Sequence, residues 1–181
     1  MILTLRTLAP ALSLLLAAPA MAQAPAAGII ALPLQPTVSA DKRGCTAKTA
    51  SGLGYSQLRG GEGRKAGADD VVLVNYIGYL SASGVTFDQG MGAVFPVDGV
   101  VPGFGEGLQL LSKGGIARLC VPSVLGYGAQ GTGPIPANAD LVFQVELVDL
   151  RTRAEVEAMR AQAAQREAAQ QQAAPAEAPK P

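Results

Sequence analysis

Aromatic and apolar side chains near a single carboxylate are the residues of this chain best suited to chemistry. The sequence has no histidine, which excludes Ser-His-Asp or Cys-His catalysis, a histidine general base and histidine-containing zinc sites. Its two cysteines are too few for an all-thiolate zinc site. Three separated runs of residues together supply an apolar, aromatic-lined pocket with one carboxylate and no nucleophile–base pair. The candidate residues are Tyr76, Phe87, Asp88, Val100, Val101, Phe104, Tyr127, Ile135 and Phe143.

Tyr127 is the most distinctive candidate because it stands between two glycines. Core packing explains an aromatic ring on such a turn poorly. Tyr76, Val101 and Phe143, taken singly, are explained best as core residues, because they lie on the core faces of their elements. It is therefore the joint pattern that favours a site.

The candidate residues must be positioned by regular elements. Strand periodicity predicts β-strands in residues 72–77, 116–121 and 141–150. Apolar side chains alternate with more polar ones in each segment, which predicts an antiparallel sheet with one face exposed to water. Between the strands, residues 103–111 form the one short helix that the pattern predicts, with Phe104, Leu108 and Leu111 on a single stripe. The predicted fold class is α+β: a twisted antiparallel sheet, or half-barrel, wrapped around one short α-helix.

The two ends of the chain differ in composition from the middle. Residues 1–22 resemble an export signal peptide, with a short apolar stretch before a small-x-small cleavage site at Ala22, although an uncleaved anchor is the alternative. Residues 23–50 are Ala/Pro-rich and are expected to form a mostly disordered spacer. Residues 51–151 form the predicted domain, and residues 152–181 form an Ala/Gln-rich tail, either a solvated, partly helical segment or a weak partner contact.

Charge argues against two classes of partner. The 14 basic and 14 acidic residues balance, and no long basic run occurs. A nucleic-acid partner or a membrane surface therefore has no electrostatic support. Neither a metal nor an organic cofactor is implied.

Three separated motifs resemble the FKBP-type peptidyl-prolyl cis–trans isomerases, and they occur in that family's order. The first is Val74–Gly78 followed by Phe87-Asp88, and the second is Val100–Phe104. The third runs from Leu125 through Gly133-Pro134-Ile135-Pro136 to Phe143. The resemblance covers roughly Gly52 to Arg151.

The resemblance implies a role for each candidate residue. Phe104 would be the floor of the pocket, Tyr127 a rim hydroxyl that holds a substrate carbonyl, and Asp88 the polar group near the rotating carbonyl. The backbone N–H of Val101 would be a second anchor for peptide. The walls would be Tyr76, Phe87, Val100, Val101, Ile135 and Phe143.

Two departures from the family pattern concern the same pocket. The floor is usually tryptophan, and here it is Phe104. Residues 89–94, after Asp88, contain neither the arginine that pairs with the aspartate in many relatives nor a further aromatic wall residue. These departures leave the orientation of Asp88 open.

The function that the resemblance implies is isomerisation of X–Pro bonds in unfolded or extended proline-containing polypeptides, in the periplasm after export. Macrolide inhibitors would be further ligands. The alternatives are a non-catalytic proline-peptide-binding chaperone or assembly module and a structural envelope protein. In an oxidising compartment, Cys45 and the outward-facing Cys120 are expected to form one intramolecular disulfide, the alternatives being free thiols or an intermolecular bridge.

Overall fold

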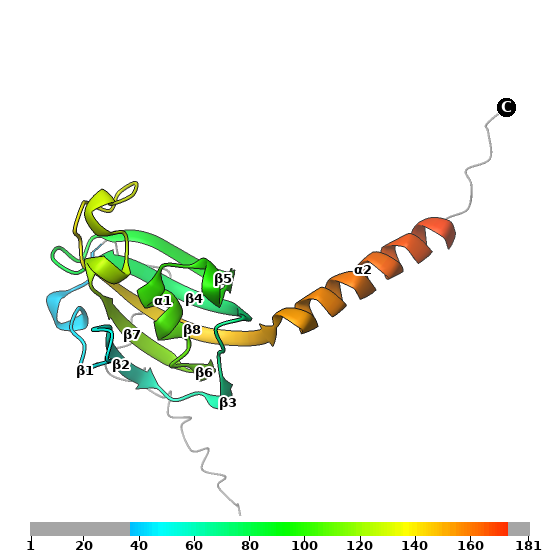
Figure 1. Cartoon of the computed structure of the whole chain (residues 1–181), viewed down its shortest axis with the longest axis horizontal. Coiled ribbons are helices and arrows are strands. Elements are labelled where there is room, and N and C mark those ends of the chain that lie inside the picture. Colours follow the sequence, from blue (N-terminus) through cyan, green and yellow to red (C-terminus); the bar gives the residue numbers. More distant parts are fainter. Residues whose placement is uncertain (1–36, 174–181) are drawn as a thin grey trace, which may run out of the picture.

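A six-stranded antiparallel sheet forms the body of the computed structural model, which describes residues 37–173 (Figure 1). The strand order is β1-β2-β7-β8-β4-β5, and every pairing is antiparallel. The strands are β1 (Ala47–Lys48), β2 (Gly54–Arg59), β4 (Asp70–Leu80), β5 (Thr86–Pro96), β7 (Ile116–Val121) and β8 (Leu141–Thr152). A separate pair joins β3 (Glu62–Lys65) to β6 (Ser112–Lys113).

One short helix, α1 (Pro102–Leu108), lies against one face of this sheet, which confirms the predicted α+β class (Figure 1). The helix contacts β7 so closely that a Cβ atom on Gly107 would lie 2.2 Å from a methyl carbon of Leu119. Phe104 and Leu108 of the helix, and Leu111 shortly after it, are all buried. The helix ends at Leu108, three residues before the predicted limit at Leu111. Its three glycines have a low helix propensity, so the helix depends on its packing against the sheet.

The face of the sheet turned away from α1 is less exposed than predicted. Ile77, Tyr79 and Val142 are fully buried there, and together with Val38 they form a second, smaller core. Tyr79 donates a hydrogen bond from its hydroxyl to the Lys42 carbonyl oxygen over 2.6 Å, and burial raises the pKa of Tyr79 to about 12. The prediction that one face of the sheet is exposed to water is therefore wrong for this half of the sheet. A segment within residues 23–50, which were predicted to form a disordered spacer, covers it.

That covering segment begins at Thr37 and includes three 3-10 residues, Ala40–Lys42, and strand β1. The domain boundary predicted at residue 51 therefore lies too far along the chain. The predicted disulfide between Cys45 and Cys120 is present, with the two Cα atoms 6.1 Å apart, and it ties this segment to β7. Alternation alone could not detect the cover, because the segment is polar and carries little strand periodicity.

The chain after β8 forms a long helix, α2 (Arg153–Ala173), which extends away from the sheet (Figure 1). A capping box starts it: the Glu155 carboxylate accepts a hydrogen bond from the Thr152 N–H at 2.7 Å, and the Thr152 hydroxyl accepts one from the Glu155 N–H at 3.2 Å. Nearly all of its described side chains are exposed, and Val156 is the one that is partly buried. The described side chains of α2 therefore lie mostly in solvent.

We expect truncation after Arg153 to leave activity and melting temperature nearly unchanged, because α2 buries little apolar surface. Thermal unfolding of the truncated and full chains, monitored by circular dichroism outside the helical bands, measures the difference. A shift within about 3 °C, less than 1 kcal/mol for a domain of this size, is the expected result. A fall of about 10 °C or more would show that α2 packs on the domain.

The predicted signal peptide, residues 23–36 of the predicted spacer, and the last eight residues of the tail lie outside the described residues. Within residues 37–173, no helix combines the length and the apolar character needed to cross a membrane.

Candidate active site

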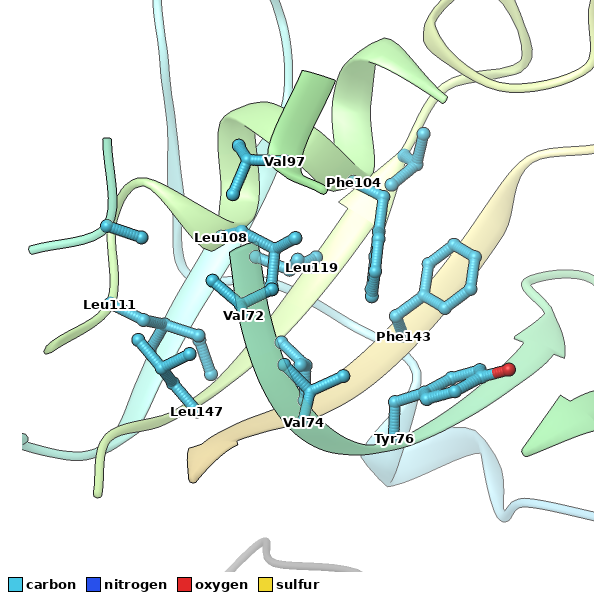
Figure 2. Close-up of a cluster of buried hydrophobic side chains, with 14 of the residues drawn as sticks. Val72, Val74, Tyr76, Val97, Phe104, Leu108, Leu111, Leu119, Phe143 and Leu147 are labelled. Carbon is cyan, nitrogen blue, oxygen red and sulfur yellow. The ribbon is translucent and has the colours of Figure 1, made fainter. Parts of the chain in front are cut away.

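Five aromatic rings gather between α1 and the concave face of the sheet, and we call them the aromatic cluster. The ring centroids of Phe104 and Phe143 lie 4.7 Å apart, and those of Tyr76 and Phe104 lie 6.1 Å apart (Figure 2). Phe87 meets Phe143 edge-on at 5.6 Å. The fifth ring, Phe95, packs edge-on against Tyr76 at 5.6 Å and against Phe104 at 6.2 Å.

The backbone of β4 is shaped to let two of these rings approach. A Cβ atom at position 78 would lie 2.6 Å from the Phe87 ring and 2.8 Å from the Phe143 ring, so only glycine fits beneath them. Gly78 is opposite Phe143 in β8 and opposite Asp88 in β5. The sequence motif around Tyr76 thus places the rings of three strands over one point of the sheet.

Helix α1 sets the position of Phe104 at the centre of the cluster. Pro102 occupies the first helical position, where its fixed φ and missing N–H are tolerated. The carbonyl oxygen of Val101 accepts hydrogen bonds from the N–H groups of Phe104 and Gly105, both at 3.0 Å. Val100 and Val101 are partly buried against the same core, and the Val101 N–H lies before the helix and outside its hydrogen-bond pattern.

Asp88 is tied to the cluster by Tyr76. The Tyr76 hydroxyl donates a hydrogen bond of 2.7 Å to one carboxylate oxygen of Asp88, and the Gln89 N–H donates one of 2.8 Å to the other. Burial of the phenol, reinforced by this bond to Asp88, raises the pKa of Tyr76 well above its ordinary value. Tyr76 therefore stays protonated and orients the carboxylate of Asp88. The sequence analysis had identified no residue that could fix this orientation.

Tyr127 and Ile135 approach from the loop between β7 and β8. Ile135 is buried and packs on the core, and its backbone pairs with Thr132 in a short bridge that closes the loop. Tyr127 remains 38% exposed on the same loop. Tyr127 thus stands at the border between the cluster and solvent.

The structure brings the predicted site residues to one region, and it adds one that sequence reasoning missed. Phe95 supplies the additional aromatic wall that residues 89–94 lack, since it follows that segment directly. Its alternation with Ala93 on β5 could have revealed it, because both face the core cluster. Residues 89–94 themselves contain no aromatic residue, as the sequence analysis states, and Phe95 packs on the cluster from the next position of β5. The carboxylate of Asp88 is contacted by the Tyr76 hydroxyl and by the Gln89 N–H.

This arrangement is apolar and largely shielded from solvent, with one carboxylate and two phenols among its polar groups. Tyr76, Phe104, Ile135 and Phe143 are each less than 10% exposed. Within residues 37–173, no group of three or more histidine, cysteine, aspartate or glutamate side chains is arranged to hold a metal ion. Such a site can exclude water from a bound group and contact it through rings and a few hydrogen bonds.

Comparison with known families gives a direct match over the same region. Residues 62–148 match the family model for FKBP-type peptidyl-prolyl cis-trans isomerase. The chain is 44% identical over 110 residues to the FKBP-type peptidyl-prolyl cis-trans isomerase FkpA of Aeromonas hydrophila, and 41% identical over 116 residues to FkpA of Escherichia coli. The matches cover 59% and 61% of this chain but only 41% and 43% of those relatives, so the chain spans about two fifths of their length.

Solved structures agree with this match. The crystal structure of FkpA from Escherichia coli superposes with a TM-score of 0.56 at 40% identity, covering 59% of this chain and 51% of that one. A peptidyl-prolyl cis-trans isomerase from Pseudomonas syringae superposes with a TM-score of 0.56 at 35% identity, covering 59% of this chain and 80% of that one.

Proposed function

We propose that this chain, which belongs to the FKBP-type peptidyl-prolyl cis–trans isomerase family, is itself an isomerase of X–Pro bonds. The observation that carries the proposal is the aromatic cluster centred on Phe104, bordered by Tyr127 and by the Tyr76–Asp88 hydrogen bond. Its substrates are unfolded or extended proline-containing segments, and its task is to assist the folding of exported proteins.

The mechanism follows from the chemistry of the amide. Rotation about an X–Pro bond crosses a barrier of about 18–20 kcal/mol and needs no proton transfer. In the twisted state the carbonyl loses resonance with nitrogen and with it some charge separation. A dry apolar site therefore favours the twisted amide over the planar one, and each tenfold acceleration requires about 1.4 kcal/mol of such preference.

Each residue of the site has a role in this mechanism. The proline ring lies on Phe104 between the walls, and the Tyr127 hydroxyl and the Val101 N–H donate hydrogen bonds to substrate carbonyls. Asp88, oriented by Tyr76, is the polar group beside the rotating carbonyl. The walls are Tyr76, Phe87, Phe95, Val100, Val101, Ile135 and Phe143. Macrolides that mimic a twisted proline amide would compete for the same rings.

A refolding assay distinguishes this activity from the rival, a binding module that holds proline peptides without turning them over. The client is a protein whose refolding is limited by one non-native X–Pro bond, and the chain is added at about one hundredth of the client concentration. An isomerase accelerates the slow phase at this ratio. If acceleration requires stoichiometric amounts, or if refolding slows, the binding module is the correct function.

We expect kcat/KM to change by less than about threefold between pH 6 and pH 8. The chain has no histidine to titrate there, and the raised pKa of Tyr76 keeps this phenol neutral throughout the range. Catalysis by desolvation and shape needs no proton transfer, whereas general acid–base catalysis produces a step or a bell in the rate. The profile is measured with a proline peptide, and a step near neutrality that disappears in Asp88→Asn would contradict the mechanism.

We also propose that the chain works in the periplasm after a signal peptide is removed near Ala22, free of stable membrane insertion and of nucleic acid. The small-x-small triplet before Gln23 and the disulfide support this location. Amino-terminal sequencing of exported protein should begin within a residue or two of Gln23. Intact Met1 in a membrane fraction would indicate an uncleaved anchor instead.

A further inference from the structure

β5 carries a bulge of one residue next to the candidate active site. The strand pairs on either side of the bulge are Val74–Ala93 and Tyr76–Gly90. Between these two pairs, β4 contributes one residue, Asn75, and β5 contributes two, Met91 and Gly92. Gly92 has a φ of +64°, which glycine adopts without strain. Bulges of this kind change the register of a strand locally and often occur beside active sites.

The bulge sets the register of the half of β5 that reaches the site. Without the extra residue, Met91 instead of Gly90 would be opposite Tyr76. A Cβ atom at position 90 would lie 2.7 Å from the Tyr76 ring, so a side chain fits there only if the ring moves. A slip of one residue would also turn the earlier side chains of β5, Asp88 included, to the other face of the sheet. The hydrogen bond of 2.7 Å from the Tyr76 hydroxyl to Asp88 therefore depends on the bulge.

Asn75 is the side chain that bonds the bulge. Its amide oxygen accepts a hydrogen bond of 2.8 Å from the Gly92 N–H, and its amide nitrogen donates one of 2.9 Å to the Glu146 carboxylate. Because a backbone N–H only donates and a carboxylate only accepts, these two partners fix the orientation of the amide. Asn75 alternates with Tyr76 along β4. It therefore connects the bulge to β8 from the face of the sheet turned away from the aromatic cluster.

The Glu146 carboxylate is anchored in turn. Its second oxygen accepts a hydrogen bond of 2.5 Å from the Arg59 guanidinium, and Arg59 also donates one of 2.8 Å from its Nε to the Gly114 carbonyl oxygen. Glu146 is opposite Asn75 in the ladder of β4 and β8, whereas Arg59 belongs to β2. A row of polar side chains thus runs across the sheet from β2 and ends at the bulge of β5.

We propose that Asn75 is a positioning residue of the isomerase site: by fixing the bulge of β5, it sets the register that presents Asp88 to the Tyr76 hydroxyl. Asn75 acts through the backbone of β5 and does not contact the substrate. The inference rests on the proposed function, because the orientation of Asp88 affects catalysis only if the site rotates X–Pro bonds. It also assigns a means of holding Asp88 to residues 89–94, a segment that contains no arginine.

Two variants of the network form the test. Asn75→Val removes both hydrogen bonds of the amide and keeps a residue type that favours strands. Gly92 is exposed and Glu146 keeps its bond to Arg59, so water satisfies the groups left without Asn75 and the fold is retained. Asn75→Asp with Glu146→Gln exchanges the amide and the carboxylate, so both hydrogen bonds form again with the donor and acceptor side chains reversed.

Lys113→Ala is the matched control. It breaks an ion pair of 3.0 Å between Lys113 and Asp149, a residue that lies on β8 like Glu146 but has no bond to the bulge. Asn75→Ala replaces Asn75→Val if valine at this position prevents folding.

Two proton signals in NMR spectra test the positioning without any turnover. In Asn75→Val, we expect the Gly92 amide to exchange at least about fivefold faster than in the parent chain. The Tyr76 hydroxyl proton, assigned by its absence in Tyr76→Phe, should also exchange faster or disappear. The exchanged pair should restore both signals, and Lys113→Ala should leave both unchanged. A faster Gly92 amide with an unchanged Tyr76 hydroxyl would show that Asn75 holds the bulge alone, and would overturn the proposal.

Kinetics on a proline peptide test the consequence for catalysis. At equal folded fraction, Asn75→Val should lower kcat by at least about threefold and change KM by less than about twofold, because Asp88 acts on the rotating carbonyl. The exchanged pair should recover at least about half of the parent kcat. Lower stability with unchanged kcat would show a purely structural residue and contradict the proposal. If the parent chain shows no turnover, the proposed function fails, and the two proton signals still decide whether Asn75 positions Asp88.

Discussion

Phe104→Ala is expected to reduce kcat/KM by at least about tenfold, a loss of about 1.4 kcal/mol or more of transition-state preference. The ring is buried at the centre of the aromatic cluster, where it contacts Tyr76, Phe95 and Phe143. Its removal takes away the surface on which the proline lies and admits water to the rotating amide. Asp88→Asn should cost much less, since the amide oxygen can still accept the Tyr76 hydrogen bond and the shape of the site is kept.

Phe104→Ala also destabilises the fold, so the activities of the variant and the parent chain must be compared at equal folded fraction. Replacing a buried phenylalanine by alanine costs about 3–5 kcal/mol of unfolding free energy. Leu108→Ala is the matched control: it lies one turn further along α1, is fully buried, and has no ring at the site. It should lower stability by about 2–5 kcal/mol and leave kcat/KM of the folded protein nearly unchanged. Full activity in Phe104→Ala would remove Phe104 from the site.

Loss of the Cys45–Cys120 disulfide is expected to lower the unfolding free energy by about 4 kcal/mol. The bridge joins residues 75 positions apart, and cross-links that close long loops restrict the unfolded chain most. It also anchors the segment that covers Ile77 and Tyr79, so its loss frees that cover. For a domain of this size the melting temperature should fall by roughly 10 °C.

Reductant provides the control for that result. Treatment of the parent chain should reproduce the melting temperature of Cys45→Ser with Cys120→Ser, and reductant should not change the double variant further. Activity of the folded protein should persist in both, because the bridge lies on the face of the sheet turned away from the aromatic cluster. An unchanged melting temperature after complete reduction would show that the covering segment is held by its other contacts alone.

How far the sequence predicted this molecule depends on the type of signal. Strands β4, β7 and β8 carry alternation, and α1 carries one apolar stripe, so the type of these elements and the antiparallel character of the sheet were predictable, whereas the strand order was not. The covering segment from Thr37 to Lys48 has no such period. Its packing depends on single contacts, such as Val38 in the second core, which become visible only when distant parts of the chain are brought together.

The candidate site shows the same division. Tyr127 was recognisable because a ring between two glycines is unusual, and the order of the motifs assembled the remaining residues. The partner of Asp88 could not be predicted, because the hydrogen bond from Tyr76 joins residues twelve positions apart in the chain, diagonally across the β4–β5 ladder in which Asp88 is opposite Gly78. Phe95 was missed because it stands one residue beyond the segment in which an aromatic wall was sought.

Exchange spectroscopy on a proline peptide at equilibrium tests the central claim most directly, because it observes both isomers and both directions of rotation. With the full chain at about one hundredth of the peptide concentration, we expect the cis-to-trans and trans-to-cis rates to rise by the same factor while the ratio of isomers stays constant. An altered isomer ratio that tracks the amount of protein, with no gain in exchange rate, would show a binding module and contradict isomerase activity.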